Sequence, residues 1–183
     1  MNETKNYSIT KSGAVILEGG ANRGVFTAGA LDFLMEQEYY IPHVIGVSAG
    51  ACNALDYVSR QIGRTRDCMI VTDEKNRYVN KNIKTIVEKK ALLDMDMVFE
   101  RYPYEIFPFD FDTYFASPQT CELVVTNCET GRAEYLDDRE NKERLLAIGR
   151  ASSSSAASST SCATTTAPSW RPARFLRSAA RSM

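Results

Sequence analysis

Two segments of the chain combine a short apolar run, a glycine-containing turn and a helix-like stretch, and this arrangement constrains the fold most. GAVILEGG at 13–20 is an apolar run closed by two glycines, which is typical of a buried parallel strand. HVIGVSAG at 43–50 repeats this pattern and leads into the helix-like segment ACNALDYVSRQ at 51–61. Two strand–turn–helix units in succession predict an α/β fold with a mainly parallel central sheet.

The helix-like part of the first unit predicts an amphipathic helix at 23–38. RGVFTAGALDFLMEQE places Phe26, Ala30, Phe33 and Leu34 at positions i, i+4, i+7 and i+8. Residues with this spacing share one face of a helix, and an apolar face of this kind is expected to pack on a core.

The rest of the chain gives weaker patterns. The segment 80–93 predicts a helix, whereas CMIVTD at 68–73 is ambiguous. The β-rich arms of 122–136 flank Glu129-Thr130-Gly131 and predict a hairpin or strand pair. NKERLLAIGRAS at 141–152 predicts a further helix.

The segment FERYPYEIFPFDFDTYF at 99–115 holds eight aromatic residues among 17. Such a concentration could wall an apolar pocket for an acyl chain. The alternative is core packing, since aromatic side chains dominate the energetics of protein cores, and the sequence favours this second interpretation.

Composition limits the class of protein and its location. A chain of 183 residues suits one domain, and its 44% hydrophobic and 25% charged residues are ordinary for a soluble protein. The N-terminus lacks an apolar signal-peptide core, and no run is long enough for a membrane span. Five scattered cysteines form no CxxC pair or zinc spacing, so we expect a reducing cytoplasm and no metal. No basic stripe appears in residues 1–150, so nucleic acid is not an expected partner.

The second unit contains the motif G-x-S-x-G, as GVSAG from Gly46 to Gly50. In a nucleophile elbow this motif forms a sharp strand-to-helix turn that lifts the serine, here Ser48, above the sheet. Glycine at both ends allows backbone to approach closely, and the helix N-terminus favours negative charge near the serine. The alternative is that Ser48 is an ordinary helix N-cap.

The first unit contains the loop EGGANRG at 18–24, which also joins a strand to a helix. Backbone N–H groups at Gly19, Gly20 and Ala21 could stabilise an oxyanion, because this role needs donors and not side chains. The alternatives are a plain tight turn or a dinucleotide-binding loop. The latter is disfavoured because Ala21 replaces the middle glycine of G-x-G-x-x-G and no ribose-binding acid follows the next strand.

Together, EGGANRGVFTAGALDFL and IGVSAGACNAL resemble the patatin-like phospholipase family, in which a D/E-G-G-x-x-R-G loop precedes G-x-S-x-G. The segments FPFDFDTYFASP and VVTNCETGRAEYL resemble its cytosolic bacterial branch. The resemblance implies a three-layer α/β sandwich, with Ser48 as the nucleophile and the amides of Gly19, Gly20 and Ala21 as the oxyanion hole. Arg23, Gly24, Gly46 and Gly50 would be motif residues, and for Arg23 a structural cap or pair remains an alternative to substrate contact.

The single histidine cannot complete a Ser-His-Asp triad. His43 lies five residues before Ser48 on the same expected strand, roughly 16 Å away at about 3.3 Å per residue. Members of the patatin-like family instead use a Ser-Asp dyad, whose aspartate belongs to a D-G-G or D-G-A motif downstream of A-S-x-x-x-P.

That aspartate is absent from this sequence. Ala151-Ser152-Ser153-Ser154 matches the start of A-S-x-x-x-P, but neither Asp nor Gly occurs after residue 150. Of the 33 residues from 151 to 183, 22 are Ala, Ser or Thr. We therefore expect a patatin-like domain at 1–152 with a sheet incomplete at its C-terminal end, followed by an aberrant or disordered tail at 153–183.

Three explanations of the tail remain open. A frameshift near residues 154–156 would explain the sudden loss of all acids after about residue 154. A natural disordered tail would have the same lack of core-forming groups. Trp170, Arg174, Phe175, Arg177 and Arg181 could also form a basic patch for a membrane surface, although Pro172 and the shortness of the segment disfavour this.

The sequence as a whole predicts a serine ester hydrolase of phospholipids or simpler acyl esters that needs no cofactor. Because its dyad aspartate is missing, we expect this chain to be inactive. The alternative function is a catalytically inactive lipid- or acyl-binding module, and a nucleotide-binding protein ranks third. The expected partners are the lipid or acyl ester, with peripheral membrane contact left open.

Overall fold

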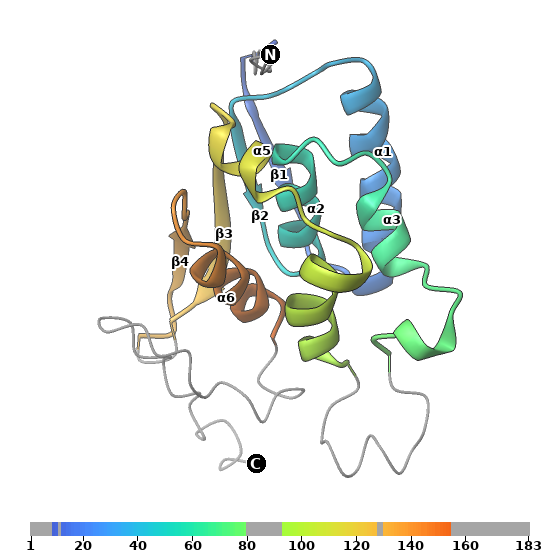
Figure 1. Cartoon of the computed structure of the whole chain (residues 1–183). Helices are drawn as coiled ribbons and strands as arrows, with labels where there is room; N and C mark the ends of the chain where they lie inside the picture. Colours follow the sequence, from blue (N-terminus) through green and yellow to red (C-terminus); the bar gives the residue numbers. More distant parts are fainter. Residues whose placement is uncertain (1–8, 11, 80–92, 128–129, 155–183) are drawn as a thin grey trace.

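The computed structural model describes residues 9–10, 12–79, 93–127 and 130–154 (Figure 1). Its elements in chain order are β1 (Ala14–Leu17), η1 (Ala21–Arg23), α1 (Gly24–Glu36), β2 (His43–Gly46), α2 (Ala49–Val58), α3 (Arg64–Met69), η2 (Glu74–Asn76), η3 (Met97–Ile106), α5 (Phe111–Ala116), β3 (Thr120–Thr126), β4 (Ala133–Leu136) and α6 (Lys142–Ser153).

The four strands form one sheet in the order β1-β2-β3-β4 (Figure 1). The first three strands are parallel, and β4 pairs antiparallel with β3. The predicted α/β fold with a mainly parallel sheet is thus confirmed, as are the two arms of the strand pair at 122–136. Because β1, β2 and β3 follow one another in the same direction, right-handed connections place α1 and α2 on the same face of the sheet.

The core lies between this face and the helices. Val44 and Leu123, from neighbouring strands, are 1% and 0% exposed. Helix α2 packs on all three parallel strands, α6 packs on β3 and α2, and α1 lies beside α2 and α3 (Figure 1). On the opposite face, the side chain of Ile16 is 73% exposed. Among the described residues, the third layer of the expected sandwich is not found.

Two expectations about burial are wrong. The strand at 13–20 was expected to be buried, but β1 is an edge strand with one buried residue, Leu17. The expected apolar face of α1 is largely exposed, with Phe26 and Phe33 at 86% and 59%.

The buried face of α1 consists instead of Gly24, Ala28, Leu31 and Met35. A Cβ atom at Gly24 would lie 3.0 Å from Ala49 Cβ. Close approach to α2, and not the size of the apolar side chains, therefore decides which face of α1 is buried.

The remaining predictions have mixed outcomes. Helix α6 confirms the helix expected at 141–152, and 68–73 forms no strand but contains the end of α3. The helix expected at 80–93 and the tail after residue 154 lie outside the described residues, apart from Leu93.

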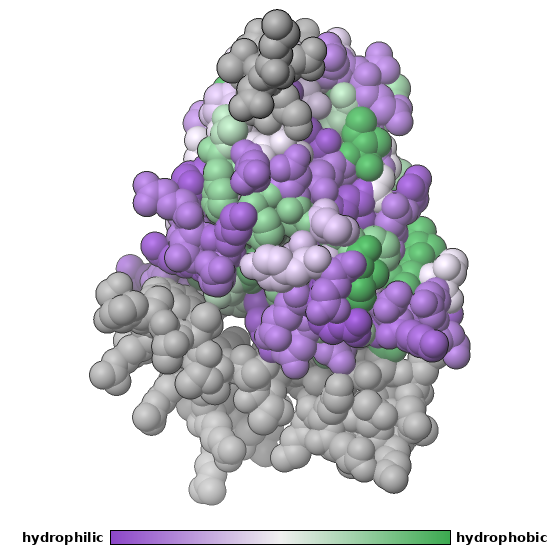
Figure 2. All heavy atoms as spheres, in the orientation of Figure 1, coloured by the Kyte–Doolittle hydropathy of each residue, from purple (hydrophilic) through white to green (hydrophobic). Residues whose placement is uncertain are grey.

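None of the described helices is long and apolar enough to cross a membrane. Hydrophilic residues predominate on the face of the molecule shown in Figure 2, where hydrophobic residues form small separate patches.

Candidate active site

Ser48 occupies a sharp turn between β2 and α2, and its backbone conformation is unusual. Its φ of 56° and ψ of −122° lie in a region that residues with side chains rarely adopt. Two glycines make the turn possible. A Cβ atom at Gly46 would lie 2.7 Å from the carbonyl carbon of Gly50, and one at Gly50 would lie 2.6 Å from that of Leu17. The G-x-S-x-G spacing therefore forms the tight turn that the sequence predicts.

Ser48 does not act as an ordinary helix cap. It occupies the N-cap position of α2, but its side chain accepts no hydrogen bond from the first turn of that helix. Among the described residues, its Oγ has no hydrogen-bond partner at all. Ser48 is thus the N-cap of α2 by position, but it lacks the side-chain bond of an ordinary cap.

The loop after β1 lies directly against this hydroxyl. A Cβ atom at Gly19 would be 3.1 Å from Ser48 Cβ and 3.8 Å from Ser48 Oγ. Ala21 adopts a positive φ of 47° and begins η1. Within the described part of the chain, the N–H groups of Gly19 and Gly20 have no acceptor. Such free donors beside a nucleophile can stabilise negative charge on a bound carbonyl oxygen.

A buried asparagine holds this loop and the serine turn together. Asn53, which is 1% exposed, donates through Nδ2 to the carbonyl oxygens of Ala49 and Gly24, at 2.9 and 3.3 Å. Arg23 donates its backbone N–H to Gly20 O at 3.0 Å. Its guanidinium is exposed and has neither an ion pair nor a hydrogen bond to any described residue, so the expected structural pairing of Arg23 is not found there.

A cavity of about 140 Å³ lies beside Ser48. One wall is a single face of α2, formed by Ala49, Cys52 and Leu55. The rest of the lining is mainly apolar and includes Met95, Val98, Phe99, Tyr102, Phe109 and Leu146. Phe99 and Phe109 also belong to the hydrophobic core. The aromatic segment at 99–115 therefore contributes to both a pocket and the core, which the sequence presented as alternatives.

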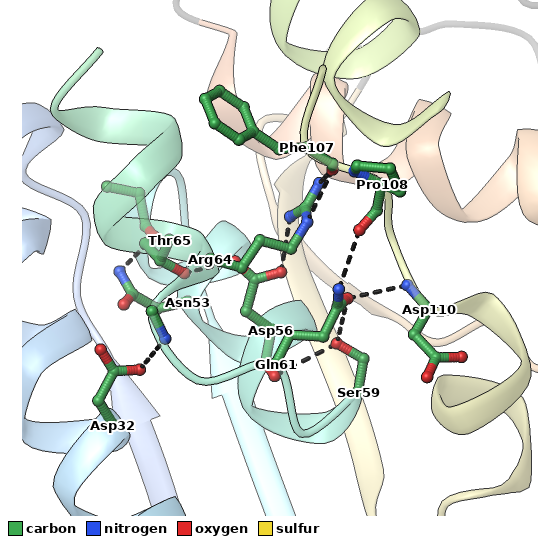
Figure 3. Close-up of polar contacts among 12 residues, drawn as sticks. Asp32, Asn53, Asp56, Ser59, Gln61, Arg64, Thr65, Phe107, Pro108 and Asp110 are labelled. Atoms are coloured by element: carbon green, nitrogen blue, oxygen red, sulfur yellow. Dashed lines mark hydrogen bonds and ion pairs between the residues drawn. The ribbon is translucent and has the colours of Figure 1, made fainter. Parts of the chain in front are cut away.

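A buried ion pair contributes polar side chains to the cavity lining. Figure 3 shows its hydrogen bonds. Arg64 Nη1 donates to Asp56 Oδ1 at 2.7 Å, and Thr65 Oγ1 donates to Asp56 Oδ2 at 2.5 Å. Arg64 also donates twice to the carbonyl oxygen of Phe107, at 3.0 and 2.8 Å. Burial raises the pKa of Asp56, and the attraction of Arg64 and the hydrogen bonds oppose this shift only in part.

No described carboxylate is placed to accept a proton from Ser48. Asp56 shares the cavity, but eight residues of helix at about 1.5 Å each separate the two positions by roughly 12 Å. Asp110 and Asp138 accept backbone N–H bonds at the starts of α5 and α6. His43 is exposed at the far end of β2.

Ser152 contacts the Ser48 turn from α6, a role that its sequence context does not predict. Its Oγ accepts the backbone N–H of Ser48 at 3.0 Å and donates to Val124 O at 2.7 Å. Ser153 lies next to it and donates to Ser48 O at 3.5 Å. The A-S dipeptide at 151–152 was the available signal, but only the fold brings it to Ser48.

No three His, Cys, Asp or Glu side chains in the described ranges lie close enough together to bind a metal ion. The two thiols in the cavity are held in their neutral form. Burial raises the pKa of Cys52 to about 11 and also raises that of Cys68. These cysteines are therefore poor nucleophiles at neutral pH.

Comparisons with known proteins agree with this fold. The family model described as patatin-like phospholipase matches residues 15–175, and the chain therefore belongs to the patatin-like phospholipase family. It is also similar to the uncharacterised protein YjjU of Escherichia coli strain K12, with 31% identity over 145 residues. That alignment covers 77% of this chain and 39% of YjjU, so the chain spans well under half the length of this relative.

Proposed function

We propose that the cavity beside Ser48 is the acyl site of a serine ester hydrolase acting on phospholipids or simpler acyl esters. The observation that carries the proposal is the position of Ser48, which combines the strained turn with a free hydroxyl and the adjacent amides of the 19–21 loop. The apolar lining of the cavity suits a fatty acyl chain.

The proposed reaction begins with attack of Ser48 Oγ on the ester carbonyl carbon. The resulting oxyanion would accept hydrogen bonds from the amides of Gly19, Gly20 and Ala21. These donors would stabilise the negative charge that develops on the oxygen. The positive end of α2 adds to this stabilisation. Collapse of the intermediate would expel the alcohol and leave an acyl-serine, which water then hydrolyses.

The proton on Ser48 Oγ needs an acceptor, and in a Ser-Asp dyad this acceptor would be the aspartate. No Asp follows residue 150 in the sequence, and no described carboxylate lies beside Ser48 Oγ. A serine hydroxyl without a base is a weak nucleophile. We therefore infer that this chain binds acyl groups but hydrolyses their esters at close to the background rate. A non-catalytic acyl-binding module is the second candidate function, and the lack of a described carboxylate beside Ser48 Oγ favours it.

A Ser48→Cys variant tests the site without requiring the aspartate. A thiol at a helix N-terminus ionises at a lower pH than a hydroxyl and needs no base for attack. We expect p-nitrophenyl hexanoate to acylate this variant at position 48, with release of one equivalent of p-nitrophenol, as followed by absorbance and peptide mass spectrometry.

The matched control is Ser153→Cys, which places a thiol in the same cavity from α6. We expect it to react more slowly because it lacks the adjacent loop amides. Equal or faster acylation at position 153 would show that Ser48 has no special position and would contradict the proposal.

A further inference from the structure

The volume of the Ser48 cavity and the residues at its far end limit the length of an acyl chain that it could hold. This inference rests on the proposed function, because it assumes that the cavity holds an acyl group. We propose that the site selects short acyl chains of about six carbons, with the chain lying along α2 and its methyl end at the Asp56–Arg64–Thr65 cluster.

The volume supports a short chain. The cavity measures about 140 Å³. Drug-sized ligands occupy pockets of roughly 300–1,000 Å³, whereas an apolar cavity of about 150 Å³ holds benzene, which has six carbons. The cavity beside Ser48 therefore has room for about six carbon atoms.

The direction of the chain follows from α2. Ala49, Cys52 and Leu55 lie at successive turns of one helix face, and each of them lines the cavity. Ser48 precedes the first of these residues, and Asp56 follows the last. An acyl group whose carbonyl lies at Ser48 would therefore extend along this apolar face towards Asp56.

The cluster at the far end cannot move aside for a longer chain. Both oxygens of Asp56 are engaged, one by Arg64 and the other by Thr65, and Arg64 also holds Phe107 O (Figure 3). Asp56 and Thr65 are 3% and 5% exposed. Separating a buried ion pair outweighs the gain from burying several additional methylene groups. The cluster therefore sets a limit on chain length.

Calorimetric titration of the full chain with straight-chain fatty acids of four to twelve carbons tests this proposal. Each methylene that enters the cavity is expected to tighten binding by about fourfold, up to about six carbons. Beyond that length, we expect no further gain. Steady tightening through twelve carbons would overturn the length limit and leave the acyl site intact.

Absence of binding at every length, for both free acids and methyl esters, would instead contradict the proposed function. The two series also identify the source of the acyl group, since preference for the ester points to an ester ligand and preference for the acid points to a free fatty acid. Either preference agrees with the length limit if its optimum lies near six carbons.

A lining variant tests the position of the chain. Leu146→Ala enlarges the cavity, and we expect its optimum to move about two carbons longer. Leu145→Ala is the control, because Leu145 is also buried on the same helix, at 0% exposed against 8% for Leu146, but does not line the cavity. If Leu146→Ala fails to fold, the half-buried lining residue Met95 provides Met95→Ala for the same test. An unchanged optimum in a folded lining variant would contradict the proposed position of the chain.

Discussion

At the scale of single residues, the position of Ser48 depends on glycines, which have no side chain and so allow close backbone approach. Gly50 lies against the backbone of β1, where a Cβ atom would come within 2.6 Å of the carbonyl carbon of Leu17. Backbone in a paired strand cannot shift as a flexible side chain can. The glycine is therefore required for α2 to begin directly above the end of the strand.

The variant Gly50→Ala should consequently destabilise the protein. We expect the free energy of unfolding to fall by about 1–3 kcal/mol or more, as for other overpacked sites. Urea denaturation provides the measurement. Gly29→Ala is the control, because a Cβ atom at Gly29 would meet nothing within 4 Å and an alanine within a helix stabilises it by about 0.5–1 kcal/mol. Similar stability of the two variants would show that the close approach at Gly50 does not exist.

A second prediction at this scale concerns pH. The pKa of Cys52 is raised by burial to about 11, so the folded state favours the neutral thiol, and this part of the stability is lost as the pH rises towards that value. At pH 8 the thiolate fraction should be about two hundred times smaller than for a free cysteine. Alkylation by iodoacetamide, followed at Cys52 by peptide mass spectrometry, should accelerate about tenfold for each pH unit above 8.

Unfolding the chain in urea supplies the comparison for this measurement. Cys52 should then react like an ordinary cysteine. If alkylation of the folded chain at pH 8 is already as fast as in urea, Cys52 is not enclosed in the cavity as described.

At the scale of secondary-structure elements, the nucleophile turn is connected to the rest of the fold through α6. The Oγ of Ser152 bridges the Ser48 N–H and the Val124 carbonyl, and thereby joins α6, β3 and the start of α2. One hydroxyl thus fixes the position of the turn relative to two other elements.

Replacement by alanine should therefore affect the turn specifically. In Ser152→Ala we expect a loss of about 1–3 kcal/mol of unfolding free energy, since two buried groups lose their partner. Hydrogen exchange at the Ser48 amide should accelerate, which mass spectrometry of peptides can measure. Ser152→Thr keeps the hydroxyl and should restore slow exchange.

The control for this prediction is Ser154→Ala. Ser154 Oγ bonds only within the end of α6, to Arg150 O at 2.8 Å. The Ser154→Ala variant should leave hydrogen exchange at the Ser48 amide unchanged. Equal effects of the two alanine variants would mean that Ser152 does not hold the turn.

Much of the arrangement of these elements could be predicted from the sequence, because strand–glycine–helix patterns are local. The parallel order of β1 and β2, the tight turn at Ser48 and the pairing of β3 with β4 all follow from short segments. The buried face of α1 could not be predicted, since it depends on the distance to α2. The Asp56–Arg64–Thr65 cluster was missed because a charged residue within a helix usually indicates a solvated face.

At the scale of the whole molecule, the described residues place the Ser48 turn, the 19–21 loop and an apolar cavity side by side, and no described carboxylate lies beside Ser48 Oγ. The chain matches its family over residues 15–175 and spans 39% of YjjU. The frameshift near residues 154–156 stays a prediction, which translation of the other two reading frames of the gene can test. Recovery of a proline followed by Asp-Gly would support it.

We propose that this chain keeps an acyl site but has no base for Ser48 among its described residues. The most direct measurement is steady-state hydrolysis of p-nitrophenyl hexanoate by the full chain and by Ser48→Ala, alongside titration with hexanoate. We predict equal, near-background hydrolysis by both proteins and stoichiometric binding of hexanoate. Rapid turnover by the unmodified chain that is lost in Ser48→Ala would contradict it, because another residue would then have to accept the proton from Ser48.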